Sequence, residues 1–304
     1  MLAKVSKNFF LFVSNNKWLN HAAKKWGFSF GASQVVAGDN IEVALKKIKE
    51  LNDKGLLCTL DHLGEFVSNK EEALAATRSV VQTLKSISDV KVKSHVSVKL
   101  TQLGLDIDYQ FCLKNMHEIL AIATRTNNFV TIDMEDYSHC QQSLDILRDL
   151  RKDYDNVGTV IQSYLYRAVQ DIKDLQGVHL RLVKGAYKES PEVAYQEKNR
   201  IDSNFRIIIQ EHLSSGSYTA IATHDDQIVD YVKQWVKEQE ISKDQFEFQM
   251  LYGFRNQLQS DLVKEGYTVR VYVPFGTDWF GYFMRRLAER PQNISFAIKG
   301  FFSK

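Results

Sequence analysis

The chain has 304 residues, of which 44% are hydrophobic and 25% charged, so it can bury one large core and is expected to be a single domain over 1–304. Its net charge of +2 comes from interspersed acids and bases, which gives no reason to expect a nucleic-acid-binding surface. The three cysteines, Cys58, Cys112 and Cys140, form no Cys-x-x-Cys pair, so they indicate neither a disulfide framework nor a zinc site and fit a reducing cytosol.

The first predicted elements precede any strand. Residues 1–40 read as helical pieces that could cover the bottom of the fold. Asp39 or Asn40 can cap a helix over 41–51 whose apolar positions keep a 3.6-residue period, and Gly55 ends it. We therefore expect residues 1–55 to form N-terminal helices.

Short runs rich in Val, Ile, Leu and Phe then predict eight strands, at 56–60, 95–100, 129–134, 158–163, 178–183, 219–223, 246–251 and 269–273. Helical patterns follow them at 70–87, 109–126, 141–153, 165–175, 191–214, 227–239, 256–265 and 279–290. Alternating strands and helices imply right-handed crossovers and a parallel sheet, and eight such units in about 250 residues close a barrel. The sequence therefore predicts an α/β fold, a (βα)8 barrel over 56–304.

Polar residues lie near the ends of these strands, where chemistry gathers in such barrels. They are Asp61 and Glu65, Lys99, Asp133 and Glu135, Gln162, Arg181 and Lys184, Thr223 and His224, Gln249 and Tyr252, and Tyr272. We expect one mouth of the barrel to collect them all as an active site.

The segment 181–190 carries two cations that leave a strand, followed by Gly185 and Ala186, which allow close backbone approach. It suits an anionic, planar or phosphorylated ligand, and it fits equally a barrel strand with a glycine turn and solvated lysines. Asp133 and Glu135 share one face of their strand and would need Lys99, Arg181 or Lys184 as cationic partners. A structural ion-pair layer is the alternative interpretation.

Arg285 and Arg286 are adjacent on the last predicted helix, after Tyr272. Paired guanidiniums suit a carboxylate, although two arginines on an exposed helix face are often only solvated. The eight histidines form neither a His-x-His pair on the first strand nor a His-Glu-x-x-His motif, so no metal site is predicted. His224, at a strand end, could contact a ligand.

Motifs near the successive strand ends resemble those of proline dehydrogenases, over about residues 57–296. They are LGE (63–65), SVKLTQLG, TIDMED, QSYLYR, RLVKGAYKE, ATHD, EFQMLYG, and YVPFG with YFMRRLAER. The length resembles the short monofunctional bacterial enzymes. Lys188 and Asp225 stand where the long bifunctional members have Trp and Asn, which concerns contacts with the adenine or ribityl part of the cofactor.

The resemblance implies a distorted (βα)8 TIM-type barrel that binds FAD and oxidises L-proline to Δ1-pyrroline-5-carboxylate, the first step of proline breakdown to glutamate. It implies catalytic roles for Asp133 and Arg181. The residues that it assigns to the substrate are Lys99, Arg285 and Arg286 as a carboxylate clamp, Tyr272 and Tyr282 as walls for the ring, and Glu65 as a gate with Arg286. Those that it assigns to FAD are Met134 by its backbone, Gln162, Lys184, Gly185, Ala186, Thr223 and His224.

The resemblance also implies a membrane quinone as electron acceptor, and a separate pyrroline-5-carboxylate dehydrogenase as a possible partner. No apolar run approaches the roughly 20 residues of a spanning helix. We therefore expect a cytoplasmic protein that touches the inner face of the membrane peripherally, through the N-terminal stretch or the tail 296–302. Two rival functions stay open: a Schiff-base aldolase that uses Lys99 or Lys184, and a non-catalytic module that binds flavin or another ligand.

Overall fold

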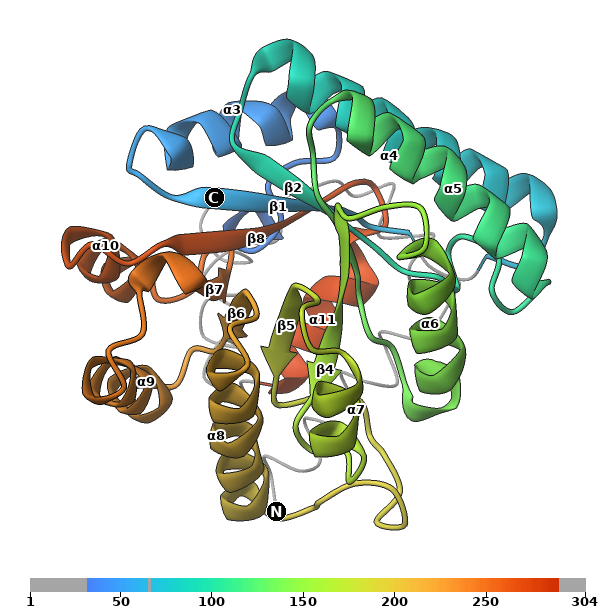
Figure 1. Ribbon diagram of the computed structural model, residues 1–304. Helices are drawn as coiled ribbons and strands as arrows, with labels where there is room; N and C mark the ends of the chain where they lie inside the picture. The colour runs from blue at the N-terminus through green and yellow to red at the C-terminus, as the bar shows by residue number, and fades with distance from the viewer. Residues whose placement is uncertain (1–31, 65–66, 290–304) are drawn as a thin grey trace.

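The computed structural model describes residues 32–64 and 67–289, with side chains in the last helix described as far as Met284. In these residues, eight parallel strands form a closed barrel in chain order, and β8 pairs with β1 (Figure 1). The strands are β1 (Leu57–His62), β2 (Ser94–Val98), β3 (Val130–Ile132), β4 (Val157–Gln162), β5 (Leu180–Val183), β6 (Thr219–Ala222), β7 (Phe246–Leu251) and β8 (Val269–Phe275). The TIM-type barrel expected from the sequence is confirmed.

Helices surround this barrel (Figure 1). They are α3 (Ile41–Asn52), α4 (Lys70–Val90), α5 (Tyr109–Arg125), α6 (Tyr137–Leu150), α7 (Ala168–Asp174), α8 (Lys198–Ser214), α9 (Asp226–Glu238), α10 (Asn256–Lys264) and α11 (Trp279–Glu289), with 3-10 turns η1 (Ala32–Gln34) and η2 (Lys243–Gln245). None of the described helices is long and apolar enough to cross a bilayer.

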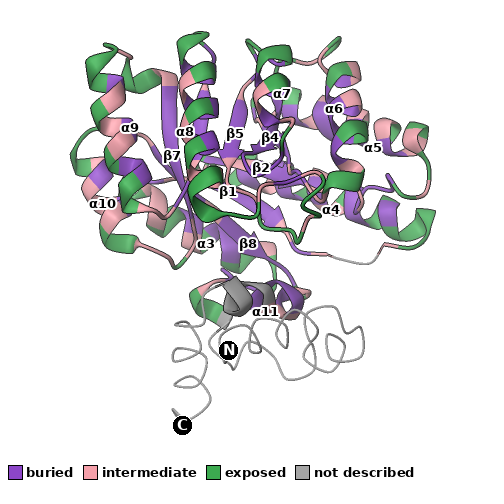
Figure 2. Cartoon of the chain, turned by 90° about the horizontal axis from the view of Figure 1, so that it is seen from below, coloured by how far each residue is buried: buried purple, intermediate pink, exposed green. Residues whose placement is uncertain are grey.

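The last helix, α11, departs from the regular ring. In Figure 1 it is seen through the ring of strands, and in the view turned by 90° it projects beyond one end of the barrel (Figure 2). Its Trp279, Tyr282 and Phe283 pack with Leu63, which follows β1, and with Val36 in a small apolar cluster separate from the main core. Helix α11 therefore lies across the carboxyl end of the barrel, and α3 contacts β1 and β8 at the seam.

The main core lies between the strands and the helices, and the barrel interior is polar. Phe246, Phe248 and Met250 of β7 are at most 2% exposed and belong to the main apolar core. Between them, Glu247 and Gln249 point to the other face, because side chains alternate along a strand. Gln249 contacts Arg181 of β5, which is not a neighbouring strand, so this second face is the inside of the barrel.

Several helix starts are set by a capping side chain. Asn40, rather than Asp39, caps α3, because its side chain accepts a hydrogen bond from the amide of Val43 at 2.9 Å. Asp108 caps α5 in the same way. Helix α6 begins at Tyr137 instead of residue 141, because Asp136 caps it.

The helix predicted from Pro191 was wrong at its start. Residues before Lys198 form a loop whose backbone pairs with the loop after β4. The amide of Tyr166 donates to the Val193 carbonyl at 3.0 Å, and the Tyr166 hydroxyl donates to the Pro191 carbonyl at 2.7 Å. These tertiary contacts use backbone groups that a helix would need.

The carboxyl ends of the eight strands differ from the predicted ends by two residues at most.

Candidate active site

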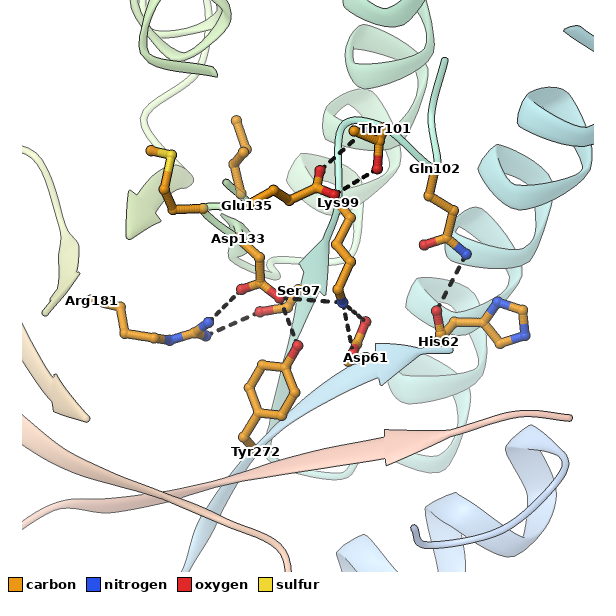
Figure 3. A network of polar contacts seen from close by, with 12 residues as sticks. Asp61, His62, Ser97, Lys99, Thr101, Gln102, Asp133, Glu135, Arg181 and Tyr272 are labelled. Carbon is orange, nitrogen blue, oxygen red and sulfur yellow. Dashed lines mark hydrogen bonds and ion pairs between the residues drawn. The ribbon is translucent and has the colours of Figure 1, made fainter. Parts of the chain in front are cut away.

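One carboxylate at the end of β3 joins two cations and a tyrosine at the barrel mouth (Figure 3). Asp133 Oδ1 accepts a hydrogen bond of 2.6 Å from Nη1 of Arg181. Asp133 Oδ2 accepts one of 2.6 Å from the Tyr272 hydroxyl and lies 3.6 Å from Nζ of Lys99. Three side chains, from β5, β8 and the end of β2, thus meet at the carboxylate of Asp133, which follows β3.

Lys99 follows β2 and is held by a second carboxylate. Its Nζ lies 2.9 Å from both oxygens of Asp61, whose side chain is 2% exposed. Burial alone lowers the pKa of the Lys99 ammonium, but the charges of Asp61 and Asp133 outweigh burial and raise that pKa above its ordinary value. Lys99 therefore stays a cation. Because a Schiff-base nucleophile must be a neutral amine, this pairing counts against the aldolase alternative.

Arg181, the second residue of β5, is 6% exposed and contacts an acceptor with each of its three nitrogens. Besides the bond of Nη1 to Asp133, Nε donates to Oε1 of Gln249 at 2.6 Å and Nη2 donates to Oγ of Ser97 at 3.0 Å. Its guanidinium carbon also lies 5.2 Å from the centre of the Tyr272 ring, a cation–π distance. The planar group is therefore fixed in both position and orientation.

Tyr272 and Glu135 complete the local electrostatics. Burial and the neighbouring charge of Asp133 raise the pKa of Tyr272 well above its usual range, so its hydroxyl stays a hydrogen-bond donor. Glu135 accepts hydrogen bonds from the amide and hydroxyl of Thr101, at 3.1 and 2.6 Å. Burial raises the pKa of Glu135. This carboxylate is thus held by Thr101, whereas the sequence suggested a cationic partner.

A second charged layer lies deeper in the barrel, toward the amino ends of the strands. Arg270 Nε donates to Oε1 of Glu247 at 2.7 Å, and Arg270 Nη1 donates to the Cys58 carbonyl at 2.9 Å. Glu247 is fully buried. Burial raises the pKa of Glu247, but the charge and hydrogen bond of Arg270 outweigh it and lower that pKa to about 2. The Gln249 amide donates to the same Glu247 oxygen at 2.5 Å and so connects the two layers.

Gln162 ends β4 and lies beside Met134, and the resemblance assigned both residues to the cofactor. Its Nε2 donates to the carbonyl of Glu135 at 3.0 Å and lies 3.4 Å from that of Met134. Its Oε1 is buried and has no hydrogen-bond partner in the described part of the chain. A buried amide oxygen without a partner is costly, so this position suits a ligand that donates a hydrogen bond.

Lys184 leaves β5 and pairs with two carboxylates, Asp202 at 2.5 Å and Asp225 at 2.7 Å. It does not pair with Asp133, although the sequence had allowed that partner. The next residue, Gly185, has φ +108°, and a Cβ there would lie 2.4 Å from the Tyr164 ring. Only glycine fits this backbone, and Ala186 beyond it is exposed.

Thr223 and His224 follow β6 with defined hydrogen-bond roles. The Thr223 hydroxyl accepts from the amide of Asp225 at 3.1 Å. The amide of Leu251 donates to Nε2 of His224 at 3.0 Å. Since Nε2 is the acceptor, the neutral His224 ring carries its proton on Nδ1.

Comparison with known proteins identifies the family of this chain. The sequence profile of the family described as proline dehydrogenase matches residues 44–299. Proline dehydrogenase 2 of Bacillus subtilis (strain 168) is 52% identical over 302 residues, which cover 99% of this chain and 100% of the relative. The proline dehydrogenase of Deinococcus radiodurans is 40% identical, over 91% of each chain. The chain belongs to the proline dehydrogenase family.

A solved structure of the same kind agrees with the fold of this family member. It is proline utilization A (PutA) from Bdellovibrio bacteriovorus inactivated by N-propargylglycine, with a TM-score of 0.82 and 25% identity. The match covers 92% of this chain and 35% of that one, so this family member spans about a third of that solved chain.

The structure brings together part of the site predicted for this proline dehydrogenase family member. Asp133, Arg181, Lys99 and Tyr272 form one network. Met134 follows Asp133 in the chain, and Nε2 of Gln162 lies 3.4 Å from the Met134 carbonyl. Tyr282 is 7% exposed in the cluster over the barrel mouth. Arg285 and Arg286 lie on α11, but their side chains are outside the described part, as is all of Glu65.

The sequence did not point to four residues that take part in the polar network of this proline dehydrogenase family member. Ser97 is an acceptor for Arg181, Thr101 holds Glu135, and Glu247 and Arg270 form the deeper layer. Strand alternation held a signal for the last two, because Glu247 shares a face with Gln249, and Arg270 with Tyr272. An arginine and a glutamate on the inner faces of adjacent strands predict a buried ion pair.

Proposed function

We propose that this chain oxidises L-proline to Δ1-pyrroline-5-carboxylate with FAD as the bound cofactor. The observation that carries the proposal is the network of Asp133, Arg181, Lys99 and Tyr272 at the barrel mouth, in a chain of the proline dehydrogenase family. The relatives named proline dehydrogenase cover almost the whole chain, which supports carrying their activity over.

The cofactor pocket would be formed by residues from the carboxyl ends of four strands: Met134, Gln162, Lys184, Gly185, Ala186, Thr223 and His224. One feature of the chain in particular fits a flavin. The buried Gln162 Oε1, without a partner among the described residues, could accept a hydrogen bond from the ring system. When bound, the flavin would supply the acceptor for the hydride that leaves the substrate.

The substrate carboxylate would be held by cations. Near the network, the positive charges of Lys99 and Arg181 are balanced by the negative charges of Asp61 and Asp133. An anionic substrate therefore requires further positive charge, and Arg285 and Arg286 on α11 would provide it. Tyr272 and Tyr282 would hold the ring of the substrate, and Glu65 would close the site through Arg286 and exclude water.

Arg181 and Asp133 would carry the catalytic electrostatics. Arg181 presents a fixed charge that stabilises the negative charge gained on reduction, and Asp133 orients Arg181, Lys99 and Tyr272 together. The substrate nitrogen must be neutral when hydride leaves the adjacent carbon, because the product is an iminium. Alkaline pH should therefore favour the step.

The electrons would pass to a membrane quinone, and the product to a separate pyrroline-5-carboxylate dehydrogenase. We propose that the protein is cytoplasmic and touches the inner face of the membrane, and that residues 1–304 form one domain. Flotation with quinone-containing liposomes tests the membrane contact, and loss of binding on deletion of 1–31 would locate it.

The deciding test is an anaerobic absorption spectrum of the purified protein before and after addition of L-proline. Flavin bands that bleach with L-proline, and stay unchanged with D-proline, would support the proposal. Flavin that stays oxidised would contradict it and favour a non-catalytic flavin-binding role. A colourless protein that takes up no flavin, and that borohydride traps with a carbonyl substrate, would favour the aldolase.

A further inference from the structure

The amide of Gln249 is the only described side-chain group that contacts both charged layers of the barrel interior through hydrogen bonds at its two ends. Its Oε1 accepts from Nε of Arg181 at 2.6 Å, and its Nε2 donates to Glu247 at 2.5 Å. Gln249 is 5% exposed, Arg181 6% and Glu247 fully buried. Solvent therefore has little access to replace either contact.

The orientation of this amide is determined by Glu247. An ionised carboxylate only accepts hydrogen bonds, so the nitrogen of Gln249 must face it and the oxygen must face Arg181. Glu247 is in turn fixed by Arg270 at 2.7 Å and by the Tyr218 hydroxyl at 3.1 Å. The deeper ion pair thus determines which end of the amide faces the catalytic arginine.

The amide also separates charge from orientation. Glu247 is neutralised by Arg270, and Gln249 itself is neutral, so Arg181 gains a third acceptor without a second carboxylate beside it. A carboxylate at position 249 would give the same contact but would add negative charge next to the arginine. An amide keeps the positive potential of Arg181 available to a ligand at the mouth.

We propose that Gln249 is a positioning residue for the oxidation of proline: held by Glu247, it fixes Nε of Arg181 so that the guanidinium presents its charge to the cofactor in one orientation. This inference rests on the proposed catalytic role of Arg181. Without the amide oxygen, Nη1 and Nη2 keep their bonds to Asp133 and Ser97, but the third fixed point is lost. The binding of the substrate carboxylate does not depend on it.

The test compares Gln249→Met with Gln259→Met. Gln259 is a matched control, because it is 2% exposed and its amide donates to the Phe254 carbonyl at 2.7 Å, on α10 outside the barrel interior. Both variants lose one buried amide. Gln249→Asn, which withdraws the oxygen by one methylene and keeps the polarity, repeats the test should the Met variant fail to fold.

Two quantities are measured on the flavin-loaded protein: kcat and KM for proline, and the midpoint potential of the flavin in a dithionite titration without proline. A hydrogen bond to a charged group is worth about tenfold or more in an equilibrium constant. We expect Gln249→Met to lower kcat about tenfold with KM close to the parent value. The two-electron potential should become more negative by about 30 mV, which corresponds to tenfold. Gln259→Met should change neither quantity.

The outcomes separate this inference from the proposed function. Equal kcat and potential in Gln249→Met and Gln259→Met would overturn the positioning role, while proline still bleaches the flavin of the parent protein. A rise in KM with kcat unchanged would also overturn it. Should proline fail to reduce the parent, the proposed function falls, and the dithionite potentials still decide whether Gln249 acts on the flavin through Arg181.

Discussion

Strand β7 differs between its two faces. On the outer face, Phe246 and Phe248 are fully or almost fully buried and pack edge to face, with ring centres 5.6 Å apart. On the inner face, one residue away, Glu247 and Gln249 take part in a charged network that reaches Arg181. Strand β8 repeats the arrangement, with Val271 outside and Arg270 and Tyr272 inside. Packing and chemistry thus occupy opposite faces of the same strands, so substitutions one residue apart should separate them.

The largest effect is expected from Phe248→Ala on the outer face. Phe248 is fully buried and packs against Phe246 and Tyr267, with ring centres 5.6 and 5.5 Å away. Deleting a buried phenyl ring costs about 3–5 kcal/mol of unfolding free energy. Urea unfolding measures this loss, and kcat and KM of the folded fraction should stay at the parent values. A large fall in kcat would show that the two faces are coupled.

The next effect is a pH dependence of stability from Glu247. Because its pKa is lowered to about 2 in the folded protein, its stabilisation is complete above the ordinary pKa of 4.5 and is lost as pH falls toward 2. The shift corresponds to about 3 kcal/mol. Urea unfolding between pH 6 and pH 3 should show a steeper fall for the parent than for Glu247→Gln. Parallel curves would mean that Glu247 gives no such stabilisation.

A smaller effect in free energy, but a large one in rate, is expected from Arg181→Met. Removing one preorganised charge from a site that stabilises developing charge lowers kcat by about 100-fold. The unfolding free energy should fall less than in Phe248→Ala, since Asp133 keeps its contacts with Lys99 and Tyr272. Anaerobic stopped-flow reduction by proline gives the rate. An unchanged rate with a large loss of stability would make Arg181 a structural residue.

The smallest effect is expected at the helix that covers the seam between β1 and β8. Asn40→Ala removes the hydrogen bond from the amide of Val43 at the start of α3 and should cost about 1 kcal/mol. Asn40→Ser keeps a capping oxygen and is the matched control. Thermal unfolding measures both, and equal melting temperatures for the two variants would show that this cap contributes little.

Periodicity was enough to predict the barrel, because the strands are short, mostly apolar runs and several of the helices begin at a capping residue. The strand-end rule also found Lys99 and Asp133 before any contact was visible, whereas Arg181 and Tyr272, which were named with them, lie within β5 and β8 and join the same network. The rule works because parallel strands end at the same edge of a sheet. These residues could therefore be grouped from their positions alone.

Contacts between distant segments could not be predicted in the same way. Pro191 looked like a helix start, but the loop after β4 uses its carbonyl. Lys184 was offered as a partner for Asp133, and it pairs instead with Asp202 on α8 and with Asp225, which caps α9. A sequence pattern gives the direction of a side chain along its strand but not which neighbour satisfies it. Such choices depend on how the loops pack.

The charged interior has a consequence for behaviour on heating. The desolvation penalty of a buried ion pair decreases as temperature rises, whereas stabilisation by apolar burial reaches a plateau. On warming, the buried pairs Glu247–Arg270, Asp61–Lys99 and Asp133–Arg181 therefore gain in stabilisation relative to the phenylalanine and valine layer around them. Heat should loosen the contact between helices and strands first, while the inner column of charges still holds the strands together.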